Sequence, residues 1–344
     1  MNNSKFSLKE IKDYTLEKGL PLSVHWAITS SCNLKCTHCY IHKDSSYVSL
    51  KTALETISFL KEKGFLIVTL SGGECLTHPY FNLIYTQLKK AGMLVNIFTN
   101  GTAFTEEIFE LFKEYKPNKV EVSIYGHDTT SFYNTTGSKD GFTLFRNNIK
   151  RLKELNINTL IKAPITNKNK DILDKFINLA KEENLNYKFG PFVFPMLNGD
   201  KMTLAERLEP NEIINIEFKD DNTKALLNDL VNKNGFREIM FEEKCSACLN
   251  NFVLNSDNSF SYCGMMIEPR FKYTGYDDIE EAYNKVLQYR DKVNEMYNNS
   301  PCKSCLNCKY CPGCPAHLLL ENNDITICND YFKRVTDLKL QIIK

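Results

Sequence analysis

Six strand-like apolar segments alternate with helical patterns between residues 22 and 195, and this repeat restricts the fold more than any other feature of the chain. The expected strands span residues 24–29, 66–70, 94–99, 120–124, 159–165 and 187–194. The helices between them are expected near residues 50–60, 81–91, 106–115, 142–155 and 172–183. Alternating strands and helices form a parallel sheet, and six units are too few to close an eight-stranded barrel. We therefore predict an α/β fold, an open partial (β/α)6 barrel of the TIM type.

Residues with binding chemistry follow three of these strands directly. A cysteine triplet follows the first strand, Gly72-Gly73-Glu74 follows the second, and Asn100-Gly101 follows the third. Ligands of barrels and open α/β sheets bind at the carboxyl ends of the strands. We expect the three segments to converge on one mouth.

The triplet consists of Cys32, Cys36 and Cys39. Three thiolates at this spacing can hold three irons of a [4Fe–4S] cluster and leave the fourth iron open to a small molecule. Zinc is the alternative, because a histidine can complete a four-ligand site. The candidates for that fourth ligand are His25, His38 and His42.

Composition excludes several functions. The net charge of +1 over 344 residues predicts no affinity for nucleic acid or for a membrane surface. No apolar run reaches the length of a membrane span, and the first 21 residues lack the apolar centre of a signal peptide. We expect a cytoplasmic protein. Its thirteen cysteines then favour metal or redox use over disulfides.

The triplet followed by Gly72-Gly73-Glu74 resembles the radical S-adenosylmethionine (SAM) enzymes, over most of residues 22–195. The resemblance implies that SAM chelates the open iron and is cleaved reductively to methionine and a 5′-deoxyadenosyl radical, which takes a hydrogen atom from the substrate. It also implies a flavodoxin-type or ferredoxin-type reductant.

Other residues near this mouth have expected roles. Glycines let the backbone approach a ligand closely, and the Glu74 carboxylate complements the ammonium group of SAM. Ser123 and Asn100 are similar in position to hydroxyl and amide groups near the ribose in relatives. Cys75 has two interpretations. It is either a hydrogen-atom donor to a substrate radical, as an epimerase requires, or a small buried residue at the end of a strand.

The last third of the chain contains nine of the cysteines and resembles the SPASM extension of some radical SAM enzymes. This small α+β domain would bind two auxiliary [4Fe–4S] clusters, which makes three clusters in total. By this resemblance the first auxiliary cluster takes Cys245, Cys248, Cys263 and Cys314, and the second takes Cys302, Cys305, Cys311 and Cys328.

The ligand set among residues 302–314 stays open. Cys311 and Cys314 are closer in sequence than is usual in the family, and Cys308 is an additional thiol that can replace Cys311. A ferredoxin-like run of Cys308, Cys311 and Cys314 is another possibility. Two zinc ribbons are the alternative for the whole region.

The domain organisation follows from these segments. We expect an N-terminal extension at 1–21, the barrel at 22–195, a helical linker at 196–235, the SPASM-type domain at 236–332 and the end of a helix at 333–344. Only about twenty residues precede the barrel in this sequence, so we expect no leader-binding domain there. A separate leader-peptide-binding protein, or the linker, would recognise a leader.

The predicted function is modification of a ribosomally made peptide, by a thioether or carbon–carbon cross-link or by epimerisation. One alternative is a radical SAM enzyme that matures sulfatases or modifies a haem precursor. Sulfatase-maturing relatives carry an aspartate after the cysteine that matches Cys263, whereas this chain has Gly264. The alternative of another class is a non-catalytic iron–sulfur electron-transfer or zinc protein.

Overall fold

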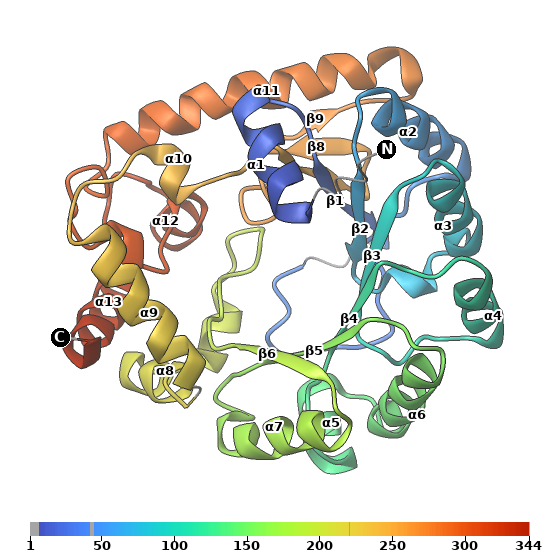
Figure 1. Ribbon diagram of the computed structural model, residues 1–344, viewed down its shortest axis with the longest axis horizontal. Coiled ribbons are helices and arrows are strands. Elements are labelled where there is room, and N and C mark those ends of the chain that lie inside the picture. The colour runs from blue at the N-terminus through green and yellow to red at the C-terminus, as the bar shows by residue number, and fades with distance from the viewer. Residues whose placement is uncertain (1–6, 42–44, 220, 344) are drawn as a thin grey trace, which may run out of the picture.

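The computed structural model describes residues 7–41, 45–219 and 221–343. Within them, one sheet of nine strands has the order β6-β5-β4-β3-β2-β1-β7-β8-β9 (Figure 1). The first six strands are mutually parallel and curve around a central space. They are β1 Ser23–Thr29, β2 Ile67–Gly72, β3 Leu94–Thr99, β4 Lys119–Ser123, β5 Thr159–Pro164 and β6 Asn186–Gly190. The predicted partial barrel is therefore confirmed.

All six expected strands are present, and the largest change in bounds is at the last one. The sequence pattern continued to residue 194, whereas β6 ends at Gly190. Pro191 follows, and proline has no N–H to donate to a strand ladder.

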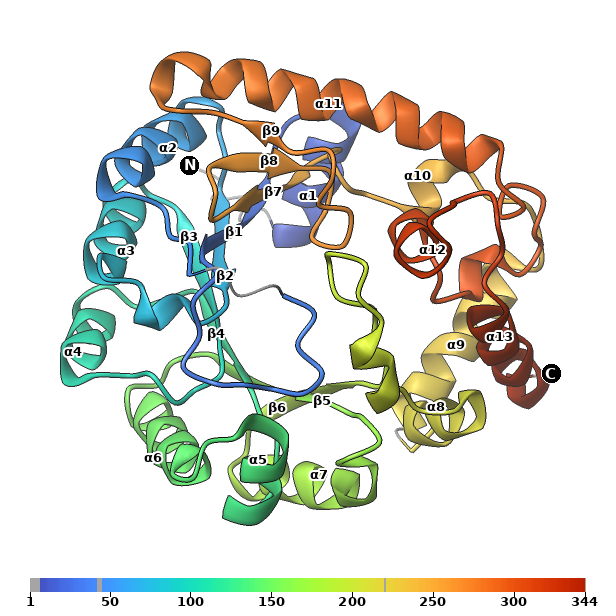
Figure 2. The same ribbon diagram turned by 180° about the vertical axis from the view of Figure 1, so that it is seen from behind.

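Helices cover the outer face of the barrel (Figures 1 and 2). The five expected from the sequence are α2 Leu50–Glu62, α3 Phe81–Lys90, α4 Glu106–Glu114, α6 Gly141–Glu154 and α7 Leu173–Glu182. A further helix, α5 Thr129–Thr136, was missed because it is short and rich in threonine. Asp128 caps it by accepting from the Ser131 N–H.

The two faces of the barrel strands differ in chemistry. Trp26, Leu70 and Val122 are fully buried against the outer helices. Residues one position away, such as His25 and Ser123, line the central cavity instead. The hydrophobic core thus lies between sheet and helices, and the inner face of the sheet is available for a site.

The C-terminal part continues the same sheet. Strand β7, Asn251–Asn255, pairs in parallel with β1, and β8 Ser259–Ser261 and β9 Phe271–Lys272 follow in antiparallel pairing. The sequence indicated the hairpin of β7 and β8 but not its pairing with β1. The 23-residue helix α11, Tyr276–Asn298, runs across this end of the sheet (Figure 2).

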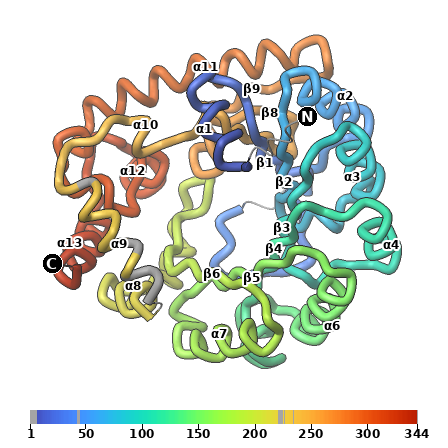
Figure 3. The backbone as a smooth tube through the Cα atoms, viewed as in Figure 1, coloured from blue at the N-terminus to red at the C-terminus, as the bar shows by residue number. Residues whose placement is uncertain are grey.

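The remaining elements form the side of the molecule opposite the barrel helices (Figure 3). Helices α8 and α13 lie side by side there, although more than a hundred residues separate them in the sequence. These elements are η3 Met202–Glu206, α8 Pro210–Glu217, α9 Asp221–Asn234, α10 Phe241–Lys244, η4 Cys308–Tyr310, α12 Pro315–Asn322 and α13 Asp330–Ile343.

The N-terminal segment is also helical, as α1 Leu8–Lys18. Asn250, just before β7, donates its side-chain amide to Thr15 Oγ1 and so connects α1 to the C-terminal part. No helix in the described ranges is both long and apolar enough to cross a membrane.

Candidate active site

A cavity of about 980 Å³ occupies the inside of the partial barrel. Its wall is formed by the inner faces and carboxyl ends of β1–β6, by the loop after β1, and by the end of the β7–β8 hairpin with the segment after it. Cys32, Asn100, Ser123 and Lys188 face it from the barrel, and Arg270 faces it from the C-terminal part. Pockets of several hundred cubic ångströms typically enclose small-molecule ligands.

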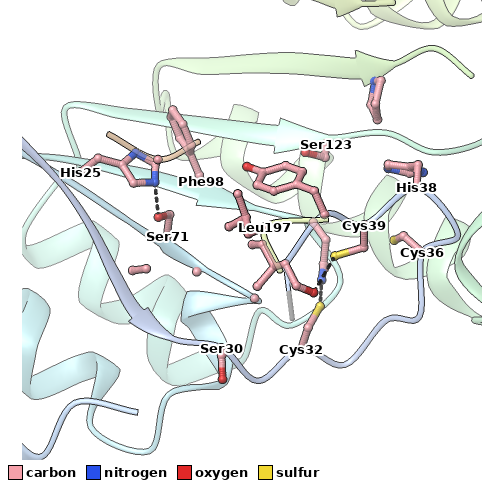
Figure 4. Close-up of a pocket in the computed structure, with 18 of the residues that line it drawn as sticks. His25, Ser30, Cys32, Cys36, His38, Cys39, Ser71, Phe98, Ser123 and Leu197 are labelled. Carbon is pink, nitrogen blue, oxygen red and sulfur yellow. Dashed lines mark hydrogen bonds between the residues drawn. The ribbon is translucent and has the colours of Figure 1, made fainter. Parts of the chain in front are cut away.

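All three cysteines of the triplet line this cavity (Figure 4). Each thiol is partly exposed and forms no disulfide. The loop that carries them is fixed to the end of α5, because Lys35 N–H donates to Thr136 O at 2.9 Å and Thr37 N–H to Thr135 O at 3.2 Å. The unexpected helix α5 therefore supports the ligand loop. Three thiols on one loop that face one cavity fit a cluster with an open iron.

Gly72 and Gly73 also line the cavity, and the structure shows why both are glycines. Gly72 has φ +127°, and a Cβ there would lie 1.9 Å from Thr29 O. A Cβ on Gly73 would lie 2.2 Å from Ser31 O. The close approach is thus to the backbone that leads into the cysteine loop. Hydrogen bonds from Gly73 N–H to Thr29 O and from Glu74 N–H to Ser31 O, both 2.8 Å, join the two segments.

Glu74 does not face the cavity. Its carboxylate is buried and accepts from Thr99 Oγ1 at 2.8 Å, from Asn100 N–H at 2.7 Å and from Leu76 N–H at 3.2 Å. Burial raises the pKa of this carboxyl to about 7, against the hydrogen bonds, which lower it. The structure brings Glu74 to the mouth as expected but directs its charge to the end of β3 rather than toward a ligand.

The two residues expected near the ribose of SAM, Ser123 and Asn100, face the cavity from the ends of neighbouring strands. Ser123, at the end of β4, lies beside Tyr125, and burial raises the pKa of the Tyr125 hydroxyl well above its usual value. Asn100 lies at the end of β3, where its side chain is hydrogen-bonded to Asn33 and Thr102. Sequence reasoning missed Tyr125, although its position two residues after Ser123 is a usable signal.

Cys75 is fully buried and lies outside the cavity wall. Its thiol is 3.3 Å from Phe98 O, and burial raises its pKa. A hydrogen-atom donor must reach the substrate, so this placement favours the second interpretation, a small buried residue.

The histidines considered as zinc ligands are separated. His25 lies further along the inner wall and is hydrogen-bonded to Ser71, and burial lowers its pKa to about 4 (Figure 4). His38 lies on the cysteine loop, with its ring 5.6 Å from that of Tyr125. His42 is outside the described residues. The inner wall that contains His25, Phe98 and Lys162 was also not predicted. Polar residues at alternate positions of the apolar strands could have indicated it.

The thiols of the C-terminal part fall into two groups. In the first group, burial raises the pKa of Cys263 to about 12, and the neighbouring thiols of Cys314 and Cys245 raise it as well. Cys248 belongs to the same group. Burial is the main cause of its raised pKa, and the neighbouring thiols of Cys263 and Cys245 raise this pKa further. These are the four residues expected to hold the first auxiliary cluster.

The second group contains five thiols. Cys302 and Cys308 are hydrogen-bonded to each other, and Cys302 also lies near Cys311. Burial and then the neighbouring Cys311 and Cys305 raise the pKa of Cys328. Cys308 is buried whereas Cys305 and Cys328 are exposed. The group has one thiol more than the four that a cluster requires. Whether Cys308 or Cys311 is a ligand stays a prediction.

Comparison with known proteins identifies the barrel. Residues 26–182 match the model of the radical SAM superfamily. The barrel residues therefore match a radical SAM domain, and domains of this superfamily bind SAM and a [4Fe–4S] cluster.

Among curated proteins, the sporulation killing factor maturation protein SkfB of Bacillus subtilis (strain 168) is 28% identical over 60% of this chain and 49% of its own. The AdoMet-dependent heme synthase of Methanosarcina barkeri (strain Fusaro / DSM 804) is 30% identical over 53% of each chain. The chain thus spans about half the length of these relatives.

Among solved structures, Streptococcus suis SuiB bound to the precursor peptide SuiA has a similar fold, with a TM-score of 0.69 and 16% identity. The similarity covers 96% of this chain and 83% of SuiB. It therefore includes the C-terminal part as well as the barrel.

Proposed function

We propose that this protein is a radical SAM enzyme that modifies a ribosomally synthesised peptide. The observation that carries the proposal is the cavity of about 980 Å³ that the cysteine triplet and Gly72-Gly73 share with the C-terminal part. When bound, the cluster and SAM supply one-electron cleavage of the sulfonium C–S bond and abstraction of a hydrogen atom from the substrate.

The chain's own residues then have defined tasks. Cys32, Cys36 and Cys39 hold the cluster, and Gly72 and Gly73 allow a ligand to approach the backbone beside it. Ser123 offers a hydroxyl to SAM from the next wall of the cavity. The surrounding wall excludes water from the reacting groups.

The peptide occupies the remaining cavity toward the C-terminal part. Lys188, at the open edge of the barrel, and Arg270, after the hairpin, bound this end. Arg270 forms ion pairs with Asp257 at 2.8 Å and with Glu268 at 3.1 Å. This end of the cavity therefore has both a cation and carboxylates, which can bind the C=O and N–H groups of a peptide main chain. The peptide assignment is supported by the name of SkfB as a maturation protein and by the peptide in the SuiB structure.

In this proposal, each of the two sets of cysteines in the C-terminal part holds one auxiliary [4Fe–4S] cluster. One group contributes Cys245, Cys248, Cys263 and Cys314, and the other contributes four of its five thiols. Complete ligation by protein favours electron transfer over direct binding of a substrate sulfur. A flavodoxin or ferredoxin would supply the electron, and a separate protein would recognise a leader.

The first experiment tests the class. Protein purified without oxygen is given dithionite and SAM, and 5′-deoxyadenosine is measured. We expect it from the wild type and not from the variant in which Cys32, Cys36 and Cys39 are alanine. A colourless wild-type protein that contains zinc would exclude the enzyme.

The second experiment tests the substrate. Mass spectrometry after co-expression with candidate peptides separates a cross-link, which removes two hydrogen atoms, from epimerisation, which leaves the mass unchanged but introduces deuterium from heavy water. The haem synthase similarity favours one competing function, modification of a haem precursor. Production of 5′-deoxyadenosine that responds to a porphyrin and to no peptide would support that function instead.

A further inference from the structure

Three side chains connect the cysteine loop to the turn after β3 in a closed ring of hydrogen bonds. Asn100 Nδ2 donates to Asn33 Oδ1 at 2.8 Å, and Asn33 Nδ2 donates to Thr102 Oγ1 at 2.8 Å. Thr102 Oγ1 completes the ring by donating to Asn100 Oδ1 at 2.7 Å. Every group donates once and accepts once around the ring, so its direction is self-consistent.

The ring fixes which way the Asn100 amide points. The backbone N–H of Thr102 lies 2.9 Å from the same amide and can only donate, so the atom facing it must be Oδ1. The nitrogen is therefore on the other side, where its second hydrogen is directed at Cys32 Sγ at 3.8 Å. Cys32 Sγ thus has an amide donor from the turn after β3, in addition to the backbone N–H of Leu34 in its own loop at 3.4 Å.

Glu74 holds the main chain of Asn100 in place. Its carboxylate accepts the Asn100 N–H and the Thr99 hydroxyl, and Thr99 Oγ1 in turn accepts the Gly101 N–H at 3.0 Å. Asn100 and Thr102 are themselves buried. A rigid, satisfied polar network in a buried place keeps one geometry.

We propose that Asn100 is a positioning residue for the SAM cluster, which supports the thiolate of Cys32 through its amide N–H and thereby raises the reduction potential of that cluster. The physical reason is that N–H donors stabilise negative charge on ligating sulfur, and reduction adds a negative charge. The inference rests on the proposed binding of a [4Fe–4S] cluster by Cys32, Cys36 and Cys39.

The test measures the potential of the cluster in the full-length protein, reconstituted with iron and sulfide, without SAM or peptide. Asn100→Asp keeps the oxygen that Thr102 requires and removes the donor to Cys32. We expect the potential to fall by about 60 mV, a tenfold change for one electron. The spectroscopic signal followed in the titration is the one that the triple alanine variant of the triplet lacks.

Asn96→Asp is the matched control. It adds the same charge to β3, the strand that ends just before Asn100, but Asn96 is hydrogen-bonded to Asn118 and Thr69 and lies outside the cavity wall. We expect this variant to keep the wild-type potential. An equal shift in both aspartate variants would show a general charge effect and overturn the inference.

Thr102→Val is the second, uncharged variant. It removes the hydroxyl that donates to Asn100 Oδ1 but keeps the backbone N–H that donates to the same oxygen, so we expect a smaller shift in the same direction. If Asn100→Asp does not take up iron, this variant tests whether the Asn100 amide raises the reduction potential of the cluster. A wild-type potential in Thr102→Val would then overturn the role of Asn100 while leaving the proposed function intact, whereas a wild type that forms no cluster would overturn both.

Discussion

The barrel and the C-terminal part place their cysteines in different surroundings. In the barrel, one loop presents three partly exposed thiols to a cavity, and a separate apolar core containing Trp26 and Leu70 holds the sheet and helices together. In the C-terminal part, residues 299–329 contain only η4 and α12, and their cysteines, apart from Cys308 in η4, lie outside helices and strands. The front cluster would therefore be added to a scaffold that already exists, whereas the back clusters would be part of the scaffold.

The largest expected effect separates the two regions directly. Replacing Cys32, Cys36 and Cys39 by alanine should abolish 5′-deoxyadenosine formation, while the midpoint of thermal unfolding stays within a few degrees. Replacing Cys302 and Cys305 should instead expose residues 299–343 to limited proteolysis, because cross-links through metal are lost. Equal protease resistance of both variants would break the comparison.

A second, smaller effect concerns the junction of β2 with the cysteine loop. Gly73→Ala would force a Cβ to within 2.2 Å of the Ser31 carbonyl oxygen, a backbone atom that cannot move aside cheaply. We expect a loss of about 4 kcal/mol in the free energy of unfolding. Gly264→Ala, in the C-terminal part, is the control, because nothing lies within 4 Å of its Cβ. It should change the free energy of unfolding by less than about 0.5 kcal/mol. Urea unfolding of both variants measures this free energy.

The pH dependence of stability tests the burial of Glu74. Its pKa is raised from 4.5 to about 7 in the folded protein, so between these values the folded state binds more protons than the unfolded state. Stability is therefore lost as pH rises through this interval. In Glu74→Gln this loss should disappear, and the stability difference between the two proteins should change by at most about 3 kcal/mol from pH 4.5 to 7. Parallel curves for the two proteins would show that Glu74 is not titrating there.

The smallest effect concerns the support that α5 gives to the cysteine loop. Asp128→Ala removes the side chain that accepts the Ser131 N–H and should cost about 1 kcal/mol. Thr105→Ala removes the corresponding cap of α4, which lies on the outer face of the barrel (Figure 2), at similar cost. Only Asp128→Ala should accelerate loss of iron to a chelator. Equal rates of iron loss would show that α5 does not stabilise the loop.

Much of the architecture could be predicted from local patterns. The six strands and five of the outer helices follow from the spacing of apolar residues, and the places of the cysteines and of Gly72-Gly73 after strands follow from their order. The missed helix α5 lacks an apolar period, and the pairing of β7 with β1 joins residues more than two hundred positions apart. The pairing leaves no signal in a local window, and α5 leaves only those of its two ends, Asp128 and Gly137.

The positions of the thiols, after the first strand and throughout the last third of the chain, can be seen without a structure, because residue type and spacing are local properties. The directions in which charges and amides point become visible only in the folded protein. Glu74 was expected beside a ligand but is turned to the end of β3, and Asn100 is aimed at Cys32 by Thr102. Such directions depend on which donors surround a buried group, and distant segments supply those donors only after the chain has folded.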